Sequence, residues 1–414
     1  MENSIPFVPT DILLPKNCDM TKWSVVACDQ YTSEPKYWNS VEKFVGSAPS
    51  TLKITLPEIY LENENVDGMT EDINRTMKEY LSDSLFYEVK NSFIYVRRML
   101  ADGKIRKGIV GAVDLEQYDF SPDSTSKIRA TEGTVLKRLP PRVRIRKDAT
   151  LELPHIMLLI DDPDMTVIEP LEEKKEQFEK LYDFELMQNS GSIKGYRISE
   201  ECSKQITDAL AKIAADFEKA HNGNLLLFAV GDGNHSLATA KTCFENLKLT
   251  TPKEYFMNHP SRYALVEVVN LHDSSLQFEP IHRAVFGVDG QKFISGLEDL
   301  FAGKTDGKQI ELNSANCRKT IFTGIDSAGL VVDAVQKYID RYLNEFGGKE
   351  DYIHGDEVAR SLGVQPQNAS ILLPKLEKSE FFPSIAEKGT FPRKTFSMGH
   401  ACDKRFYLEC RKIL

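Results

Sequence analysis

A short polar turn near the middle of the chain carries the residues best suited to chemistry. Its sequence, Gly231-Asp-Gly-Asn-His-Ser236, contains a carboxylate at Asp232, an imidazole at His235 and two glycines. A carboxylate can hold a metal ion or orient a nucleophile, and an imidazole can donate or accept a proton near neutral pH. Neither residue type is needed merely to reverse the chain. We therefore predict catalytic roles for Asp232 and His235, with Asp232 as the contact for a metal ion.

The elements around this turn are expected to make it an anion site. Residues 224–230 read as a buried strand, and apolar residues recur at helical spacing over 237–247. The unpaired amides and the dipole of a helix N-terminus attract anions, and glycines let a phosphate approach the backbone. The predicted phosphate-binding residues of the turn are Gly231, Gly233, Asn234 and Ser236. The alternative is a tight turn in which Asp232 or Asn234 only caps the helix.

Length and charge limit the function classes. A chain of 414 residues is long enough for two or three domains, and a net charge of −10 disfavours a surface built mainly for nucleic acid. No apolar run approaches the roughly 18 residues of a membrane-spanning helix, and the first residues lack a signal-peptide pattern. We expect a cytoplasmic protein with a small-molecule or nucleotide partner and no membrane partner.

Cysteine and histidine spacing disfavours a dedicated transition-metal centre. The seven cysteines show no close C-x-x-C pair, and the eight histidines show no H-x-H or H-x-x-x-H spacing. Scattered cysteines in odd number suit reduced thiols better than a disulfide framework or a zinc site.

A basic stretch, residues 129–147, has two alternative interpretations. Six lysines and arginines lie between positions 137 and 147, interrupted by Pro140 and Pro141. Because proline disrupts helix interiors, we predict a loop rather than a regular helix. The charges then either are simply solvated or line the rim of an anionic pocket.

The order of elements predicts an α/β protein with a mixed α+β sheet. Between residues 154 and 285, buried strands at 156–160 and 263–270 alternate with helices at 171–182 and 200–219. The predicted regions are a strand-rich α+β part at 1–128, an α/β core with the phosphate-binding turn at 129–285, and a helical and α+β part at 286–414.

Residues 356–375 imitate a helix-turn-helix, the signature of a DNA-binding protein. The second helix would contain Pro374 in its interior, and the apolar run 369–373 fits a short strand at least as well. We therefore predict that residues 369–373 are extended and that this element does not read DNA.

Several short motifs together resemble those of the domain-of-unknown-function family numbered 1015, whose members carry an Asp-Gly-His-His-Arg-like turn. The matching segments are Val26-Ala-Cys28 with Tyr31, Thr131-Glu-Gly-Thr134, His155–Asp162, Asp232-Gly-Asn-His235, Pro280-Ile-His-Arg283 and Phe391-Pro-Arg-Lys-Thr395. They cover nearly the whole chain in order. The family is similar to the ParB, sulfiredoxin and ADP-dependent serine kinase fold group. Its members often carry a SpoOJ/ParA/ParB chromosome-partitioning label, which rests on similarity of fold and not on the residues of a site.

The resemblance implies a ParB/sulfiredoxin-like core with N-terminal and C-terminal elaborations. It also implies that the turn binds the phosphates of a nucleotide, ATP or ADP, together with Mg²⁺. Glu132 is then expected to be the general base. His282, Arg283, Arg393 and Lys394 would neutralise phosphate charge. This chain departs from the pattern because Ser236 replaces an arginine and Asn234 a histidine, which removes a bidentate phosphate donor. Arg283, Arg393, Lys394 or a residue of the 137–147 cluster is expected to supply the missing charge.

These observations favour an enzyme that binds a nucleotide or phosphorylated metabolite and transfers or hydrolyses a phosphoryl group, with a small amino acid such as serine as an acceptor by fold analogy. The alternative is a ParB-like DNA-binding or chromosome-partitioning protein, which needs a basic DNA surface. A third hypothesis, a metabolite sensor without catalysis, keeps the pocket but does not need Glu132.

Overall fold

The computed structural model describes residues 4–414, which form two compact units. The first unit contains the described residues up to Leu276 together with His400–Leu414, and the second contains Gln277–Gly399. Within residues 4–414, no helix is long and apolar enough to cross a membrane.

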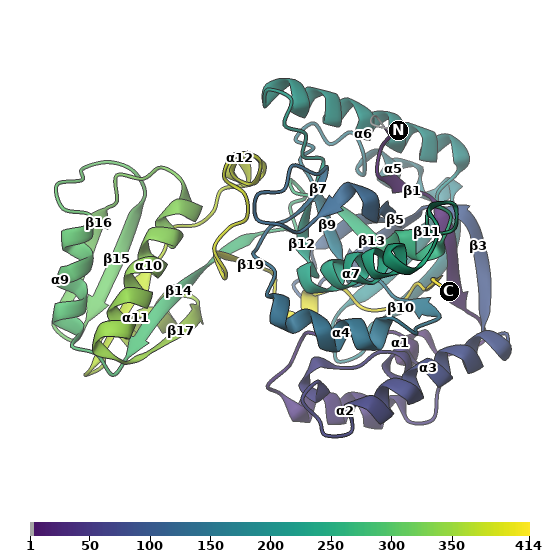
Figure 1. Cartoon of the computed structure of the whole chain (residues 1–414), viewed down its shortest axis with the longest axis horizontal. Helices are drawn as coiled ribbons and strands as arrows, with labels where there is room; N and C mark the ends of the chain where they lie inside the picture. The colour runs from purple at the N-terminus through teal and green to yellow at the C-terminus, as the bar shows by residue number, and fades with distance from the viewer. Residues whose placement is uncertain (1–3) are drawn as a thin grey trace. The chain divides into compact units, whose positions relative to one another are not determined.

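The first unit is built on a ten-stranded mixed sheet (Figure 1). Its path runs through β10 (Glu179–Glu185), β11 (Ser192–Arg197), β4 (Ile94–Met99), β5 (Ile105–Asp114), β13 (Tyr263–Asn270), β9 (Met157–Ile160), β12 (Phe228–Asp232), β7 (Ile128–Ala130) and β6 (Tyr118–Asp119), and β1 (Phe7–Val8) pairs with β5. Most pairs are antiparallel, but β13 with β9, β12 with β7 and β6 with β7 are parallel. The predicted mixed α/β class is confirmed.

Both faces of this sheet are covered, which explains its apolar strands. In β4, Tyr95 contributes to one core cluster, whereas Ile94 and Val96 contribute to the other, as the alternation of a strand requires. The first cluster takes side chains from α5 (Pro170–Lys174), α6 (Glu200–Ala220) and α7 (Asn234–Thr250). The second takes them from α1 (Met20–Trp23), α2 (Pro35–Val45) and α3 (Val66–Ser82). Figure 1 shows α6 above the sheet and α2 and α3 below it.

The two units differ from the three regions predicted from the sequence, 1–128, 129–285 and 286–414. Strand β5 pairs with β13 from Asp114 opposite Tyr263 to Gly108 opposite Val269, so residues on both sides of position 128 share one sheet. The last residues also return to the first unit, where β20 (Arg411–Lys412) pairs with β8 (Leu151–Glu152). Pairing between segments distant in sequence places the boundaries at 276 and 399.

The helix predicted at 171–182 is wrong over its second half. Helix α5 ends at Lys174, a 3₁₀ turn covers Lys175–Gln177, and β10 begins at Glu179. Tyr182 lies opposite Gly195 of β11, where a side chain at Gly195 would overlap the tyrosine ring. The Tyr182 hydroxyl donates to the buried Glu409 at 2.5 Å. These long-range contacts favour the strand over the charged helical pattern.

The prediction that prolines keep 137–147 from forming a helix is also wrong. Helix α4 (Leu139–Arg146) has Pro140 and Pro141 in its first turn. Backbone amides of the first turn have no intrahelical acceptor, and the fixed φ of proline suits a helix start.

The second unit is an antiparallel sheet in the order β16 (Cys317–Phe322), β15 (Gln309–Ser314), β18 (Asn368–Leu372), β14 (Phe278–Phe286) and β17 (Lys349–His354), with β19 (Phe396–Met398) paired to β14. Helices α9 (Gly290–Leu300) and α10 (Ala328–Phe346) share one core with the sheet. Helix α11 (Asp356–Gly363) contributes to a second, smaller core, and α12 (Lys378–Lys388) follows β18. The predicted extended conformation after α11 is confirmed by β18, so a strand stands where a recognition helix would be.

Candidate functional site

The predicted strand, turn and helix are present in the first unit, but residues 224–227 of the strand predicted at 224–230 are not part of it. Strand β12 ends at Asp232, α7 begins at Asn234, and Gly233 between them has a left-handed φ of 79°. A Cβ atom on Gly233 would lie 3.0 Å from the Ile156 Cα atom. Both the conformation and the close approach of the β9 segment therefore require glycine here.

The N-terminus of α7 lacks a side-chain cap among the described residues. Gly233 is its N-cap residue. The Asn234 amide group instead faces Thr131, accepting from the Thr131 amide and donating to its hydroxyl, both at 3.3 Å. Within residues 4–414, the backbone amides of Asn234 and Ser236 have no hydrogen-bond acceptor, and both residues are partly exposed. The capping alternative therefore does not describe this turn.

The Asp232 carboxylate joins the turn to the C-terminal segment. Its Oδ1 atom accepts the Gly233 amide at 3.0 Å, and its Oδ2 atom lies 3.3 Å from Lys404 Nζ. Oδ2 makes no hydrogen bond within the described chain. Both side chains of this ion pair are mostly buried, with 15% of Asp232 and 17% of Lys404 exposed. The Asp232 carboxylate thus lies beside the N-terminus of α7, where the helix dipole favours anionic groups.

The segment that carries Glu132 is hydrogen-bonded to the turn on both sides of that residue. Thr131 contacts Asn234, and its hydroxyl donates to the Val230 carbonyl at 2.6 Å. The Val135 amide donates to His235 Nε2 at 3.4 Å. The structure therefore brings Glu132 to the same region as Asp232 and His235. An Nε2 acceptor places the proton of a neutral His235 ring on Nδ1.

Three further residues at the turn escaped the sequence analysis: Asp29, His155 and Lys404. The His155 ring lies beside Gly233, where an added Cβ would come within 3.4 Å of His155 Cδ2. His155 Nδ1 lies 2.9 Å from the Tyr407 hydroxyl, which accepts the Cys28 amide at 3.2 Å.

Asp29 is held in its charged form by this environment. Burial alone would raise the pKa of the Asp29 carboxyl, but the charge of His155, a hydrogen bond from Gln30 and the charge of Lys404 together hold that pKa below its ordinary value. Lys404 therefore acts on Asp29 as well as on Asp232. We call the resulting group the turn cluster; its members are Asp29, Glu132, His155, Asp232, His235 and Lys404.

Sequence motifs held a partial signal for the missed residues. Asp29 directly follows the Val26-Ala-Cys28 motif, and His155 begins the His155–Asp162 segment. Lys404 lies beyond the last motif, in a segment whose backbone is held by distant strands and loops, such as Tyr407 N–H donating to the Val25 carbonyl at 2.8 Å. No local pattern marks such a residue.

Most of the basic stretch is engaged in ion pairs. Arg142 pairs with Glu58, Arg144 with Asp67, Arg146 with Glu152 and Lys147 with Asp148. Lys137 and Arg138 differ, because both are exposed and neither has a carboxylate partner within residues 4–414. They directly follow Leu136, next to the Val135 that contacts His235. Of the six residues, these two have charges available for a ligand at the turn.

The other predicted phosphate-neutralising residues lie in the second unit. Arg283 is fully buried and donates to Gln336 Oε1 at 2.8 Å and to the Ile281 carbonyl at 2.6 Å. His282 accepts the Leu373 amide at 3.1 Å through Nδ1, and its Nε2 lies 3.0 Å from Asp356 Oδ1.

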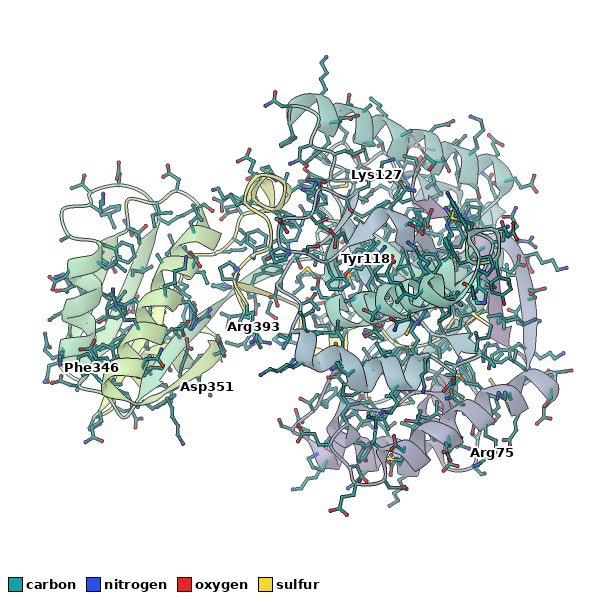
Figure 2. All side chains as sticks on the ribbon, viewed as in Figure 1. Arg75, Tyr118, Lys127, Phe346, Asp351 and Arg393 are labelled. Atoms are coloured by element: carbon teal, nitrogen blue, oxygen red, sulfur yellow. The ribbon has the colours of Figure 1, made fainter. Side chains whose placement is uncertain are left out.

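Arg393, labelled in Figure 2, and Lys394 have exposed side chains, and their carbonyls accept from Arg283. The side chains of His282 and Arg283 thus form hydrogen bonds that stabilise the second unit. A phosphate-binding role for these four residues stays a prediction.

The residues of the turn fit a Mg²⁺ contact only in part. Within the described residues, no group of three or more His, Cys, Asp or Glu side chains is arranged to hold a metal ion. Mg²⁺ often uses only one or two protein carboxylates, with phosphates and water completing its shell. Asp232 Oδ2, which lacks a hydrogen bond, is the oxygen that suits such a contact.

The family described as "Protein of unknown function (DUF1015)" matches residues 10–400. The chain belongs to this family. A sequence comparison with curated proteins gives no match.

Solved structures similar to this DUF1015 protein include SbnI with a C-terminal truncation from Staphylococcus aureus, at 10% identity over 70% of this chain and 82% of that chain, with a TM-score of 0.36. A free serine kinase in complex with AMP is 12% identical over 71% of this chain and 89% of that chain, with a TM-score of 0.36. A conserved hypothetical protein from Pyrococcus furiosus is 12% identical over 73% of this chain and 94% of that chain, with a TM-score of 0.35.

At TM-scores below 0.5, these likenesses carry no argument about activity.

Proposed function

We propose that this DUF1015 protein binds a nucleotide or another phosphorylated metabolite at residues 231–236 and transfers or hydrolyses a phosphoryl group. The observation that carries the proposal is the uncapped N-terminus of α7, flanked by Asp232, His235 and Lys404. Free amides at such a terminus bind phosphate oxygens, and the neighbouring side chains supply acid–base chemistry.

Positive charge for the phosphates comes from three lysines and arginines of the first unit. Lys404 lies at the turn itself, and Lys137 and Arg138 lie on the segment that contacts His235. Family members carry an arginine where this chain has Ser236. Lys137 and Arg138, both exposed, supply the positive charge of that arginine. The predicted contribution of His282, Arg283, Arg393 and Lys394 is kept as a secondary proposal.

The turn cluster has the groups that phosphoryl transfer needs. A hydroxyl or water oxygen attacks the terminal phosphorus, the bond from that phosphorus to the leaving phosphate oxygen breaks, and a base takes the attacking proton. Glu132 or Asp29 is the base, and Asp29 is charged at neutral pH because its pKa is held low. His235 donates its Nδ1 proton to a phosphate oxygen. Mg²⁺ arriving with ATP or ADP would neutralise phosphate charge and contact Asp232.

Serine or another small amino acid is proposed by fold analogy, and water is the alternative acceptor. A non-catalytic metabolite sensor would use the same amides and lysines without Glu132. The ParB-like DNA-binding alternative is weakened by β18, which occupies the place of a recognition helix.

The test combines binding with product detection. ATP, ADP and AMP are titrated into the full chain with and without Mg²⁺, followed by thermal unfolding, and phosphorus NMR detects transfer to serine or release of phosphate. A ligand at 100 times its dissociation constant adds about 2.7 kcal/mol to the free energy of unfolding. The proposal predicts stabilisation by at least one nucleotide and its loss in Asp232→Ala. Absence of stabilisation by nucleotides and by inorganic phosphate would disprove it, whereas binding without turnover would leave the sensor hypothesis.

A further inference from the structure

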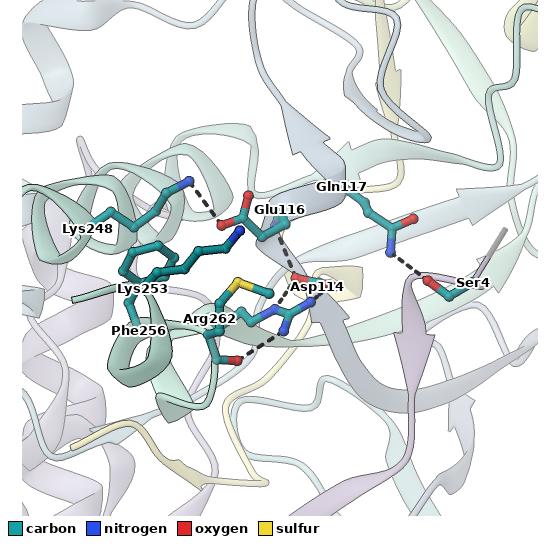
Figure 3. A pocket seen from close by; sticks show the side chains of 9 residues that line it. Ser4, Asp114, Glu116, Gln117, Lys248, Lys253, Phe256 and Arg262 are labelled. Carbon is teal, nitrogen blue, oxygen red and sulfur yellow. Dashed lines mark hydrogen bonds and ion pairs between the residues drawn. The ribbon is translucent and has the colours of Figure 1, made fainter. Parts of the chain in front are cut away.

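A cavity of about 500 Å³ lies at the other end of α7 from the turn (Figure 3). Lys248 in the last turn of α7 lines it, together with Lys253 and Phe256 of α8 (Lys253–Phe256). A helix of 17 residues is about 25 Å long, so the cavity is separate from Gly233 at the helix start. Its volume lies in the range of small-molecule sites, about 300–1,000 Å³.

The charges that line the cavity leave one cation unmatched. Arg262 donates to both oxygens of Asp114, at 2.9 and 2.6 Å. Lys248 Nζ lies 2.9 Å from Glu116 Oε1. Lys253 has no carboxylate within ion-pair distance among the described residues, and Figure 3 shows its ammonium drawn without a dashed line, directed toward the other lining residues. A bound monoanion would match this single charge.

The remaining wall is suited to an apolar body. The Phe256 ring and the Met257 side chain line the cavity, and both are partly exposed. Gln117 and Ser4, joined by a hydrogen bond of 3.4 Å, add neutral polar groups. An organic molecule could therefore place an aromatic or aliphatic group on Phe256 and a charged group on Lys253.

We propose that this cavity is a second ligand site, which binds a small organic carboxylate with an aromatic or aliphatic body. Both lining carboxylates already have cationic partners, which disfavours a cationic ligand. A phosphate dianion would need a second unmatched cation, and none lines the cavity within the described residues. The inference is independent of the function proposed for the turn.

The test compares three probes of one shape in the full chain: benzoate, benzamide and benzylammonium, each titrated by calorimetry. Benzoate is expected to bind at least tenfold more tightly than benzamide. The Lys253 ammonium forms a stronger hydrogen bond with a charged carboxylate than with a neutral amide oxygen. Benzylammonium is expected not to bind. Equal affinity for benzamide, tighter binding of benzylammonium or no saturable binding of benzoate would each overturn the proposal.

Variants locate the binding. Lys253→Gln and the isosteric Gln117→Glu are both expected to weaken benzoate binding about tenfold, since the first removes the cation and the second adds a carboxylate. Lys212→Gln, an exposed charge loss on α6, is the matched control and should leave the affinity unchanged. Asp232→Asn should also leave it unchanged. Normal benzoate affinity in both Lys253→Gln and Gln117→Glu, or weakened affinity in Asp232→Asn, would contradict a site in this cavity.

Discussion

Lys404 Nζ lies 3.3 Å from Asp232 Oδ2, so the C-terminal segment supplies the counter-charge of the carboxylate that begins the turn. Asp29 comes from the opposite end of the chain. Burial raises the pKa of its carboxyl, but the charges of His155 and of the same Lys404 lower it. Lys404 therefore links three distant segments at the proposed phosphate site.

Replacing Asp232 separates a structural from a catalytic role. Asp232→Asn keeps an oxygen for the Gly233 amide but leaves Lys404 without its partner charge. We expect the free energy of unfolding to fall by about 1–3 kcal/mol, because Lys404, whose side chain is mostly buried, loses its partner charge. Turnover of the substrate found by the nucleotide screen should fall by about 100-fold or more. Full activity of Asp232→Asn would assign the residue to architecture.

Gly233→Ala should destabilise the first unit through both backbone strain and contact. A left-handed residue with a Cβ costs about 1–2 kcal/mol, and the Cβ would also crowd Ile156 at 3.0 Å. Gly223→Ala is the matched control, because Gly223 has a φ of +87° with nothing within 4 Å of a Cβ. Urea unfolding should show a larger loss for Gly233→Ala than for Gly223→Ala. Equal losses would mean that the approach of Ile156 is unimportant.

Lys137 and Arg138, which pair with no carboxylate of the described residues, should affect nucleotide affinity more than their paired neighbours do. Lys137→Gln together with Arg138→Gln is expected to raise the dissociation constant about tenfold, with a weaker salt dependence, because exposed charges attract phosphate over a Debye length of about 8–10 Å. Arg144→Gln removes a charge that already pairs with Asp67 at 2.8 Å and should change affinity little. Calorimetry at two salt concentrations measures both. A larger effect from Arg144→Gln would contradict the assignment.

Asp29 should contribute stability that depends on pH. Its folded pKa is held below the unfolded value of about 3.9, so the carboxylate stabilises the fold fully above that pH. The contribution is lost as pH falls through the folded pKa. The difference in free energy of unfolding between wild type and Asp29→Asn should be constant from about pH 5 to 7 and shrink below about pH 4. A difference that grows with acidity would refute the charged state of Asp29.

Substitution of Arg283 should lower the free energy of unfolding strongly, whereas substitution of Arg393 should leave it nearly unchanged. Arg283→Met removes a fully buried guanidinium that donates to Gln336 and to backbone carbonyls, and breaking such a network costs about 3–5 kcal/mol. Arg393→Gln changes an exposed side chain and should leave stability within about 0.5 kcal/mol. Chemical unfolding measures both variants. A tenfold loss of nucleotide affinity in Arg393→Gln would confirm its predicted binding role, and unchanged affinity would remove it.

The sequence alone was sufficient for features set by local backbone chemistry. An apolar run, a turn with glycine at its left-handed position and helical spacing afterwards gave β12, Gly233 and α7, because these depend on neighbouring residues. The extended run after α11 was likewise predicted from Pro374 and its apolar neighbours, and β18 confirms it.

Tertiary structure alone decided which distant side chains meet at the turn. Lys404 arrives through backbone contacts of the C-terminal segment with residues near position 25. His155 arrives because it lies just before β9, which pairs with β12. The charges at 137–147 looked equivalent in sequence. Carboxylates from distant segments nevertheless pair with Arg142 and Arg144, whereas no carboxylate of residues 4–414 pairs with Lys137. Register and pairing between remote segments are set by burial of the whole core rather than by any local pattern, so spacing in the sequence could not reveal them.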